Sequence, residues 1–436
     1  MTFKSIPNPD CATPISFKSV CLRHRWLFTV SASAVALLSH SFFLSAAAVD
    51  ADAEANRSIS PVLLTDVIAE FKPNTQKSQA PTLATPIDLA QIDAGPRPNS
   101  PDIRRQGSEV LGKPSVQLQG VYRLEGDDSS ARGRAIATYP VTPDLLFGAV
   151  VDLTTGNAFS DTPEGGLSLT ELYVAASPSA VPNVRVVAGL MDLTSYFDRN
   201  SFAKDGASHF FNLAFQTNPA LSAAGLSSRP GVLLNWSVTD NLEVKAATFS
   251  SSRRLGDFSF DSVAAEIGWR AGTAIVRGTY LSSRDAGQET GFREIFDIPR
   301  FGDFGPQRRD REEAYGVNAE LFIPQLNMGL FGRYGRYNNT TLGAGGDTYS
   351  VGLSFLDLFQ RDDRLGLAYG RQLSDNDLRR LSDDDRRPDV LELYYDFRIS
   401  PALRAAVTLQ ERNEFSETVL GFRIKTEFDV TRRLLR

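Results

Sequence analysis

The sequence has 436 residues, a formal net charge of −6 and a pI near 5.4, so it lacks the basic excess that is typical of nucleic-acid-binding proteins. Mean hydropathy is −0.20, and no run of 12 uninterrupted apolar residues occurs after residue 50. A helix that crosses a membrane needs about 20 mostly apolar residues. Membrane crossing by helices in this part of the chain is therefore excluded.

The first residues differ from the rest in composition. The basic residues Lys18, Arg23 and Arg25 precede the stretch WLFTVSASAVALLSHSFFLSAAA, and acidic Asp50 follows it. The final alanines, 46–48, resemble a signal-peptidase cleavage site. This order predicts a secretory signal peptide over residues 1–48, with a retained membrane anchor as the alternative.

Two cysteines, Cys11 and Cys21, both precede the apolar stretch and would leave with the signal peptide. The exported chain would then have no disulfide, and a large core or a closed sheet must hold it together. Residues 49–113 are rich in Pro, Ala, Asp, Ser and Gln. This composition predicts a flexible linker.

From residue 115 onward, apolar and polar residues alternate with a period of two, and turn residues interrupt the pattern at regular intervals. Most of the runs have the length of about 9–11 residues that a membrane-spanning strand needs. The sixteen candidate strands are 115–124, 132–140, 144–153, 167–176, 183–190, 230–238, 242–250, 260–269, 273–282, 313–323, 328–336, 347–356, 363–371, 389–399, 403–411 and 417–428.

Alternation alone does not separate a membrane barrel from a soluble sandwich, but the lengths of the connections do. Every second connection is short, and most of the others are longer, with 191–229 and 283–312 as the extremes. Outer-membrane barrels have tight periplasmic turns and long external loops. We therefore predict an all-β fold, a transmembrane antiparallel β-barrel of about 16 strands over residues 114–428, with a short tail at 429–436.

An even strand count returns the chain to the periplasm, which makes residues 49–113 a periplasmic linker. A barrel of this size leaves a water-filled lumen. The charged residues of the strands lie opposite the apolar positions, so we expect them to face that lumen. The candidate lumen-facing charges are Arg123, Arg185, Lys245, Glu320, Arg333 and Arg423.

The connection 191–229 is the third external loop, and it mixes aromatic rings with charged and amide side chains. Aromatic faces beside planar hydrogen-bonding groups suit sugars; the alternative is that the rings pack against the inner wall and form a rigid plug. We expect the loop to fold inward and narrow the pore. The candidate constriction and solute-path residues are Asp192, Tyr196, Phe197, Asp198, Arg199, Asn200, Phe202, Lys204, Asp205, Phe210 and Asn212.

The stretch GLMDLTSYFDRNSFAKDGASHFFNLAF, which begins at Gly189, resembles the motif G-K-x-D-x-T-x-Y-F-D-x-N-x-F-A-N-D-E of the carbohydrate-selective, OprB-type porins. The resemblance implies a passive, sugar-permeable pore of the outer membrane. Two places differ: Leu190 replaces the basic residue of the motif, and 204–206 reads Lys-Asp-Gly instead of Asn-Asp-Glu. A preference for glucose therefore does not follow from the resemblance.

No enzyme is predicted, because the exported chain has one histidine, His209, and its neighbour Ser208 does not by itself make a catalytic pair. No cofactor or metal site is predicted either. The expected partners are small sugars or ions as solutes and outer-membrane lipids, not nucleic acid, and the architecture is compatible with a homotrimer. A general or inorganic-ion porin and a structural or adhesion barrel are the alternative functions.

Overall fold

The computed structural model describes residues 114–159, 165–285, 291–300, 302–381 and 386–431. The predicted signal peptide (1–48) and linker (49–113) lie outside these ranges and stay predictions. The last five residues of the predicted tail also lie outside them.

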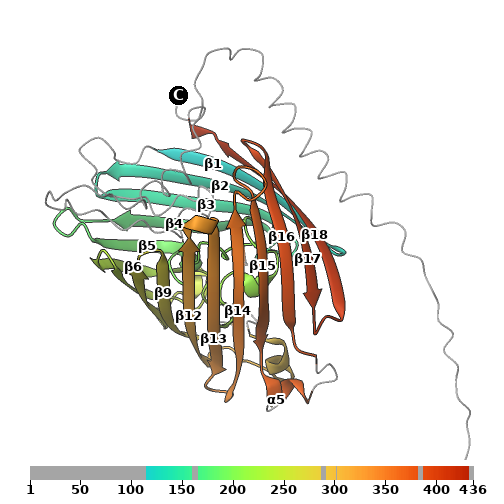
Figure 1. The fold of residues 1–436 in the computed structure, drawn as a ribbon. Helices are drawn as coiled ribbons and strands as arrows, with labels where there is room; N and C mark the ends of the chain where they lie inside the picture. The colour runs from blue at the N-terminus through green and yellow to red at the C-terminus, as the bar shows by residue number, and fades with distance from the viewer. Residues whose placement is uncertain (1–113, 160–164, 286–290, 301, 382–385, 432–436) are drawn as a thin grey trace, which may run out of the picture. The chain divides into compact units, whose positions relative to one another are not determined.

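Sixteen strands form a closed antiparallel barrel, in which each strand pairs with its neighbours in the chain and the first strand pairs with the last (Figure 1). The strands are β1 (Ser115–Glu125), β2 (Asp128–Thr142), β3 (Leu145–Thr155), β4 (Gly166–Ala176), β5 (Val184–Asp192), β6 (Ser228–Thr239), β7 (Leu242–Phe249), β8 (Ser262–Ala271), β9 (Ala274–Arg284), β12 (Arg311–Ile323), β13 (Met328–Asn339), β14 (Ala344–Leu356), β15 (Arg364–Ser374), β16 (Asp389–Ser400), β17 (Leu403–Arg412) and β18 (Glu417–Asp429).

Closure comes from the pairing of β1 with β18, whose register runs from Gln117 opposite Asp429 to Glu125 opposite Gly421. Just past β18, the amide of Val430 donates to the carbonyl of Val116 at 3.0 Å. A closed ring leaves no unpaired strand edge, which a lipid environment requires. The predicted antiparallel barrel of about 16 strands is confirmed.

The strand boundaries differ from the prediction by a few residues at the ends of the strands. The strand predicted over 132–140 extends over Asp128–Thr142, and the one predicted over 347–356 begins at Ala344. A small hairpin of β10 (Pro299–Arg300) and β11 (Asp303–Phe304), within the predicted connection 283–312, was not predicted. Its strands of two residues are too short to show a two-residue period.

Each barrel strand has two different faces. Leu393 and Leu420 are 43% and 69% exposed, whereas Glu392 and Arg423, each on the opposite side of the same strand, are 0% and 1% exposed. We call these sides the apolar face and the polar face. The exposed side is apolar and the covered side is charged, the reverse of a soluble β-sandwich.

Most connections also sort by length, although only residues 126–127 join β1 to β2 and the seven residues 357–363 join β14 to β15. The turns that follow β6, β8 and β16 have two residues each, whereas residues 193–227 join β5 to β6 and residues 285–310 join β9 to β12. We call the two ends of the barrel the short-turn end and the long-loop end.

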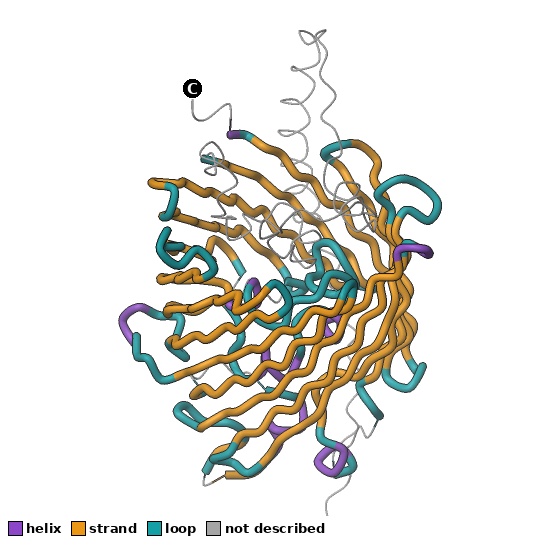
Figure 2. Tube along the Cα trace, turned by 60° about the vertical axis from the view of Figure 1, so that its left-hand side comes forward, coloured by secondary structure: helices purple, strands orange, loops and turns teal. Residues whose placement is uncertain are grey.

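The helices are short (Figure 2). They are η2 (Leu193–Ser195), η3 (Leu213–Phe215), α4 (Pro219–Ala223), η4 (Leu255–Asp257), η5 (Arg293–Asp297), η6 (Pro324–Leu326) and α5 (Asn376–Arg379). Among the described residues, none of these helices has the length and apolar character needed to span a bilayer.

Candidate functional site

The segment 193–227, between β5 and β6, is shaped locally by short polar side chains. Asp192, Asn200, Asp205, Asn212 and Asn218 each accept a hydrogen bond from the backbone amide two residues further along, at 2.9–3.1 Å. Asp and Asn side chains favour such turns because they reach the nearby amide without strain. Three of these residues also cap η2, η3 and α4, so the sequence specifies a series of tight turns.

Asp198 joins the segment to the polar face of two strands. Its amide donates to the carboxylate of Glu266 on β8 at 2.7 Å, and its carboxylate lies 3.3 Å from the guanidinium of Arg333 on β13. The carboxylate also accepts the amide of Asn218 at 2.7 Å. Asp198 has a φ of 51°, a left-handed conformation that Asp adopts more readily than most residues.

A second set of contacts holds the residues next to Asp198. Glu320 on β12 accepts the amide of Ser201 at 2.6 Å and the guanidinium of Arg277 on β9 at 2.8 Å. The same guanidinium donates to the carbonyl of Arg199 at 2.9 Å. Both members of this ion pair therefore contact the main chain of the segment: Glu320 accepts an amide, and Arg277 donates to a carbonyl.

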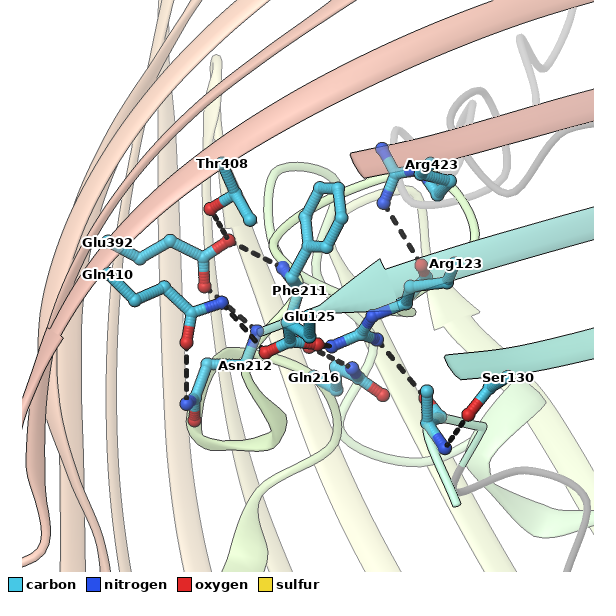
Figure 3. A network of polar contacts seen from close by, with 12 residues as sticks. Arg123, Glu125, Ser130, Phe211, Asn212, Gln216, Glu392, Thr408, Gln410 and Arg423 are labelled. Carbon is cyan, nitrogen blue, oxygen red and sulfur yellow. Dashed lines mark hydrogen bonds and ion pairs between the residues drawn. The ribbon is translucent and has the colours of Figure 1, made fainter. Parts of the chain in front are cut away.

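Glu392 on β16 holds the middle of the segment (Figure 3). Its two carboxylate oxygens accept the amides of Phe211 and Asn212 at 2.6 and 2.8 Å, and the hydroxyl of Thr408 donates to it at 3.0 Å. The side-chain amide of Asn212 donates to Gln410 on β17 at 3.1 Å. A buried backbone amide needs a hydrogen-bond acceptor. The Glu392 carboxylate supplies one to each of two successive amides and therefore fixes the path of the chain here.

Two arginines, one from the first and one from the last strand of the barrel, contact the ring of Phe211. The guanidinium carbon of Arg123 on β1 lies 5.0 Å from the ring centroid, and that of Arg423 on β18 lies 4.6 Å from it. Arg423 also donates to the carbonyls of Gly206 and His209 at 3.0 and 2.7 Å, and Arg123 donates to the carbonyl of Phe211. Both arginines therefore hold the segment by cation–π contacts with Phe211 and by hydrogen bonds to backbone carbonyls.

The aromatic rings of the segment are buried in two clusters. Tyr196 and Phe197 pack with α4 and the walls of β5 to β9, whereas Phe202 and Phe210 pack with β12, β13 and β16. The centroid of Phe210 lies 4.6 Å from that of Tyr394 on β16. The ring faces expected to meet solute are thus in contact with other side chains.

The remaining candidate residues are placed as follows. Lys204 is buried and donates to the carbonyl of Thr194, and Arg199 is half-buried. Lys245 on β7 lies 3.0 Å from the carboxylate of Glu266 and donates to the carbonyl of Tyr196 at 2.8 Å. Among the charges expected to face the lumen, only Arg185 is half-buried. The others, all buried on the polar face, are Arg123, Lys245, Glu320, Arg333 and Arg423.

Several wall residues that hold the segment were not among the candidates. They are Glu266, Arg277, Asn318, Glu392 and Gln410, and each lies on the polar face of its strand. The two-residue alternation along each strand was the signal that could have found them, because each occupies a position opposite the apolar side chains. Among the described residues, no group of three or more His, Cys, Asp or Glu side chains is arranged to hold a metal ion.

Comparison with known proteins identifies the family. The profile of the carbohydrate-selective porin, OprB family, matches residues 147–410, which is more than half of the chain. The chain belongs to this family. Its family and its fold are those of channels of the outer membrane.

Two relatives place this OprB-family chain among known proteins. An uncharacterized protein of Aquifex aeolicus (strain VF5) is 25% identical over 252 residues, which cover 57% of this chain and 66%, just under two thirds, of that protein. The structure of Pseudomonas putida OprB at high pH superposes with a TM-score of 0.56 and 16% identity, covering 72% of this chain and 94% of that one. At this identity, the likeness concerns the fold.

Gly206 is a departure from the OprB-type motif that the structure explains in part. A Cβ at this position would lie 2.6 Å from a guanidinium nitrogen of Arg123 and 2.7 Å from the side-chain nitrogen of Gln216. The glutamate of the motif would need both side chains to move. Glycine therefore lets the arginine of β1 approach the main chain of the segment.

Proposed function

We propose that this protein is a passive channel for carbohydrates and other small hydrophilic solutes across the outer membrane, and that segment 193–227 folds into the barrel and narrows the passage. The observation that supports the constriction most strongly is the distribution of its wall contacts. The segment is hydrogen-bonded to polar-face side chains of β1, β7, β8, β9, β12, β13, β16, β17 and β18. Contacts with the polar faces of so many strands of a closed ring support a path of the segment through the space that the ring encloses.

The pairing of charges favours neutral solutes over ions. Ion pairs join Lys245 to Glu266 at 3.0 Å and Arg277 to Glu320 at 2.8 Å, and Arg423 lies 2.9 Å from Asp396. A fixed charge selects ions through its field, and a neighbouring opposite charge at this distance cancels most of that field. Sugars, which need hydrogen bonds and no net charge, fit such a passage better than an inorganic ion does.

We assign the buried rings a supporting role, not direct contact with sugar. Tyr196, Phe197, Phe202 and Phe210 are covered by other side chains, so their faces are not open to a passing solute. The charged and amide groups then hold the main chain, and the rings fill the space between segment and wall. This corresponds to the rigid-plug alternative for these rings.

A shortened segment tests the proposal. Deletion of residues within 196–215 should raise the single-channel conductance in planar bilayers while heat-modifiable gel migration stays normal, because the barrel's hydrogen bonds run from strand to strand. Shortening residues 251–260, between β7 and β8, is the control and should leave conductance unchanged. Unchanged conductance after deletion within 196–215 would place the segment outside the passage.

Liposome swelling separates the solute classes. Vesicles that contain the protein should swell in isotonic glucose and other small sugars, whereas an adhesion barrel with no open passage would give no swelling. Reversal potentials close to zero in a salt gradient would agree with weak ion selectivity. A large reversal potential together with slow sugar entry would favour the ion-porin alternative.

A further inference from the structure

The long-loop end of β9 and β12 presents two arginines directly opposite each other. Arg284, the last residue of β9, is the register partner of Arg311, the first residue of β12. Counting in steps of two places them on the same face as Tyr280 and Tyr315, which are also register partners, and as the exposed Val317. Both arginines therefore lie on the apolar face, at its outer margin.

Like charges directly across two strands repel each other unless an opposite charge lies between them. Among the described residues, Arg284 has no hydrogen-bond or ion-pair partner, and Arg311 donates to a backbone carbonyl, that of Asp261, at 3.0 Å. On the next two strands, an arginine of the same end does have a counter-charge: Arg336 on β13 lies 3.0 Å from the carboxylate of Asp347 on β14. Among the described residues, neither arginine of the pair on β9 and β12 forms an ion pair, although Glu313 lies two residues from Arg311 on the same face.

Three further arginines lie on the two connections that follow β7 and β9. Arg309 is exposed and has a φ of 83°, which is strained for a residue other than glycine, and Arg254 is exposed on the neighbouring loop. Arg308 makes only a long, exposed contact of 3.5 Å with Asp257, which joins the two loops. Among the described residues, the side chains of Arg254 and Arg309 have no partner.

Asp261, whose carbonyl accepts a hydrogen bond from Arg311, has a carboxylate that is hydrogen-bonded within its own loop. Asp261 accepts the amide of Ser251 at 2.8 Å and the hydroxyls of Ser251, Ser259 and Ser262 at 2.9–3.0 Å. Partial burial acts to raise its pKa, but these hydrogen bonds outweigh it and hold the pKa of the Asp261 carboxyl below its usual range. Its lone pairs are directed at the serines, so the Asp261 carboxylate forms no ion pair with the arginines.

Exposed rings lie on the same loop as Arg254. Phe258 and Phe260 pack edge to face with centroids 4.8 Å apart, and they are 43% and 57% exposed. Aromatic residues at the margin of an apolar membrane face are typical of the interface between acyl chains and headgroups. We call Arg254, Arg284, Arg308, Arg309 and Arg311, together with these two rings, the outer rim patch.

We propose that the outer rim patch binds the phosphorylated headgroup of a lipid in the outer leaflet, with guanidinium groups on its phosphates and the two phenylalanines against its apolar part. The assignment rests on the proposed function for one point, that the long-loop end faces outward. Guanidinium groups pair with phosphate in a bidentate way, and a phosphate between Arg284 and Arg311 removes their repulsion. A cluster of four to eight basic residues beside a membrane surface is typical of anionic-lipid recognition.

Native mass spectrometry of the full-length protein in detergent, titrated with bis-phosphorylated lipid A, tests the site. The double variant Arg284→Gln/Arg309→Gln should weaken lipid A binding by about ten-fold or more, because two charge-assisted contacts are lost. The matched control is Arg361→Gln/Arg380→Gln, which removes two exposed arginines of other loops. The control should bind lipid A like the unaltered protein.

Two further probes identify the chemistry of the ligand. Dephosphorylated lipid A should bind much more weakly, and inorganic phosphate should displace bound lipid A only in large excess. Equal binding of the dephosphorylated lipid, equal loss in the control variant, or displacement by phosphate at concentrations equal to that of the lipid would each overturn the proposal. Conductance is a separate readout: both double variants should conduct normally, and a protein that binds lipid A but forms no channel would contradict the proposed function alone.

Discussion

The arginines that hold segment 193–227 and those of the outer rim patch are the same residue type in opposite surroundings. Arg333 and Arg423 are buried, lie beside a carboxylate and donate to backbone carbonyls. Arg284 and Arg309 are exposed, and among the described residues neither has a partner. A buried arginine must be satisfied by the protein, whereas an exposed one stays available to bind something else. Pairing, more than charge itself, therefore separates the arginines that hold segment 193–227 from those that we propose to bind a lipid headgroup.

The strongest test of this difference removes one partner of a buried pair. Asp198→Ala should lower the free energy of unfolding by about 3–5 kcal/mol, because Arg333 would keep its charge in a buried position without the carboxylate. Thermal unfolding in detergent, followed by the gel shift of the folded barrel, measures the loss. The double variant Asp198→Ala/Arg333→Leu should recover part of the stability, and a double variant as unstable as the single one would show that the pair is not the cause.

A milder change tests whether the Glu392 carboxylate holds the main chain of segment 193–227. Glu392→Gln replaces one carboxylate oxygen with an amide group that cannot accept, so one of the Phe211 and Asn212 amides loses its acceptor. We expect a loss of about 1–3 kcal/mol and larger current fluctuations in single-channel recordings. The exposed Glu417→Gln on β18 is the control. Recordings as quiet as those of the unaltered protein would argue against a role of Glu392 in holding the segment.

The smallest effect is expected for the pair of Arg336 on β13 and Asp347 on β14, which is partly exposed. Arg336→Gln should change the free energy of unfolding by no more than about 1 kcal/mol, because exposed ion pairs contribute little. The same thermal unfolding assay measures it. A loss as large as that of Asp198→Ala would mean that exposed and buried ion pairs contribute equally to the stability of this barrel.

The strands and their faces were predictable from the sequence, and the contacts of the segment were not. Alternation identifies the inward side of β16, but it does not tell how high Glu392 lies in the barrel or that it meets Phe211, 181 residues earlier in the chain. The two interpretations of the aromatic rings were equally compatible with the sequence, because solute contact and packing both need aromatic residues. Only the three-dimensional arrangement distinguishes a covered ring from an open one.

The wall holds segment 193–227 largely by main-chain atoms: the amides of Ser201 and Phe211 and the carbonyls of Gly206, His209 and Phe215. A hydrogen bond to the peptide backbone does not depend on which side chain the bonded residue carries. The segment can therefore change at its uncovered positions over evolutionary time while its path is preserved. Leu213, which is 43% exposed between two anchored residues, is such a position. If the segment lines the passage as proposed, Leu213 offers a place where the chemistry of the passage can be redesigned without rebuilding the barrel.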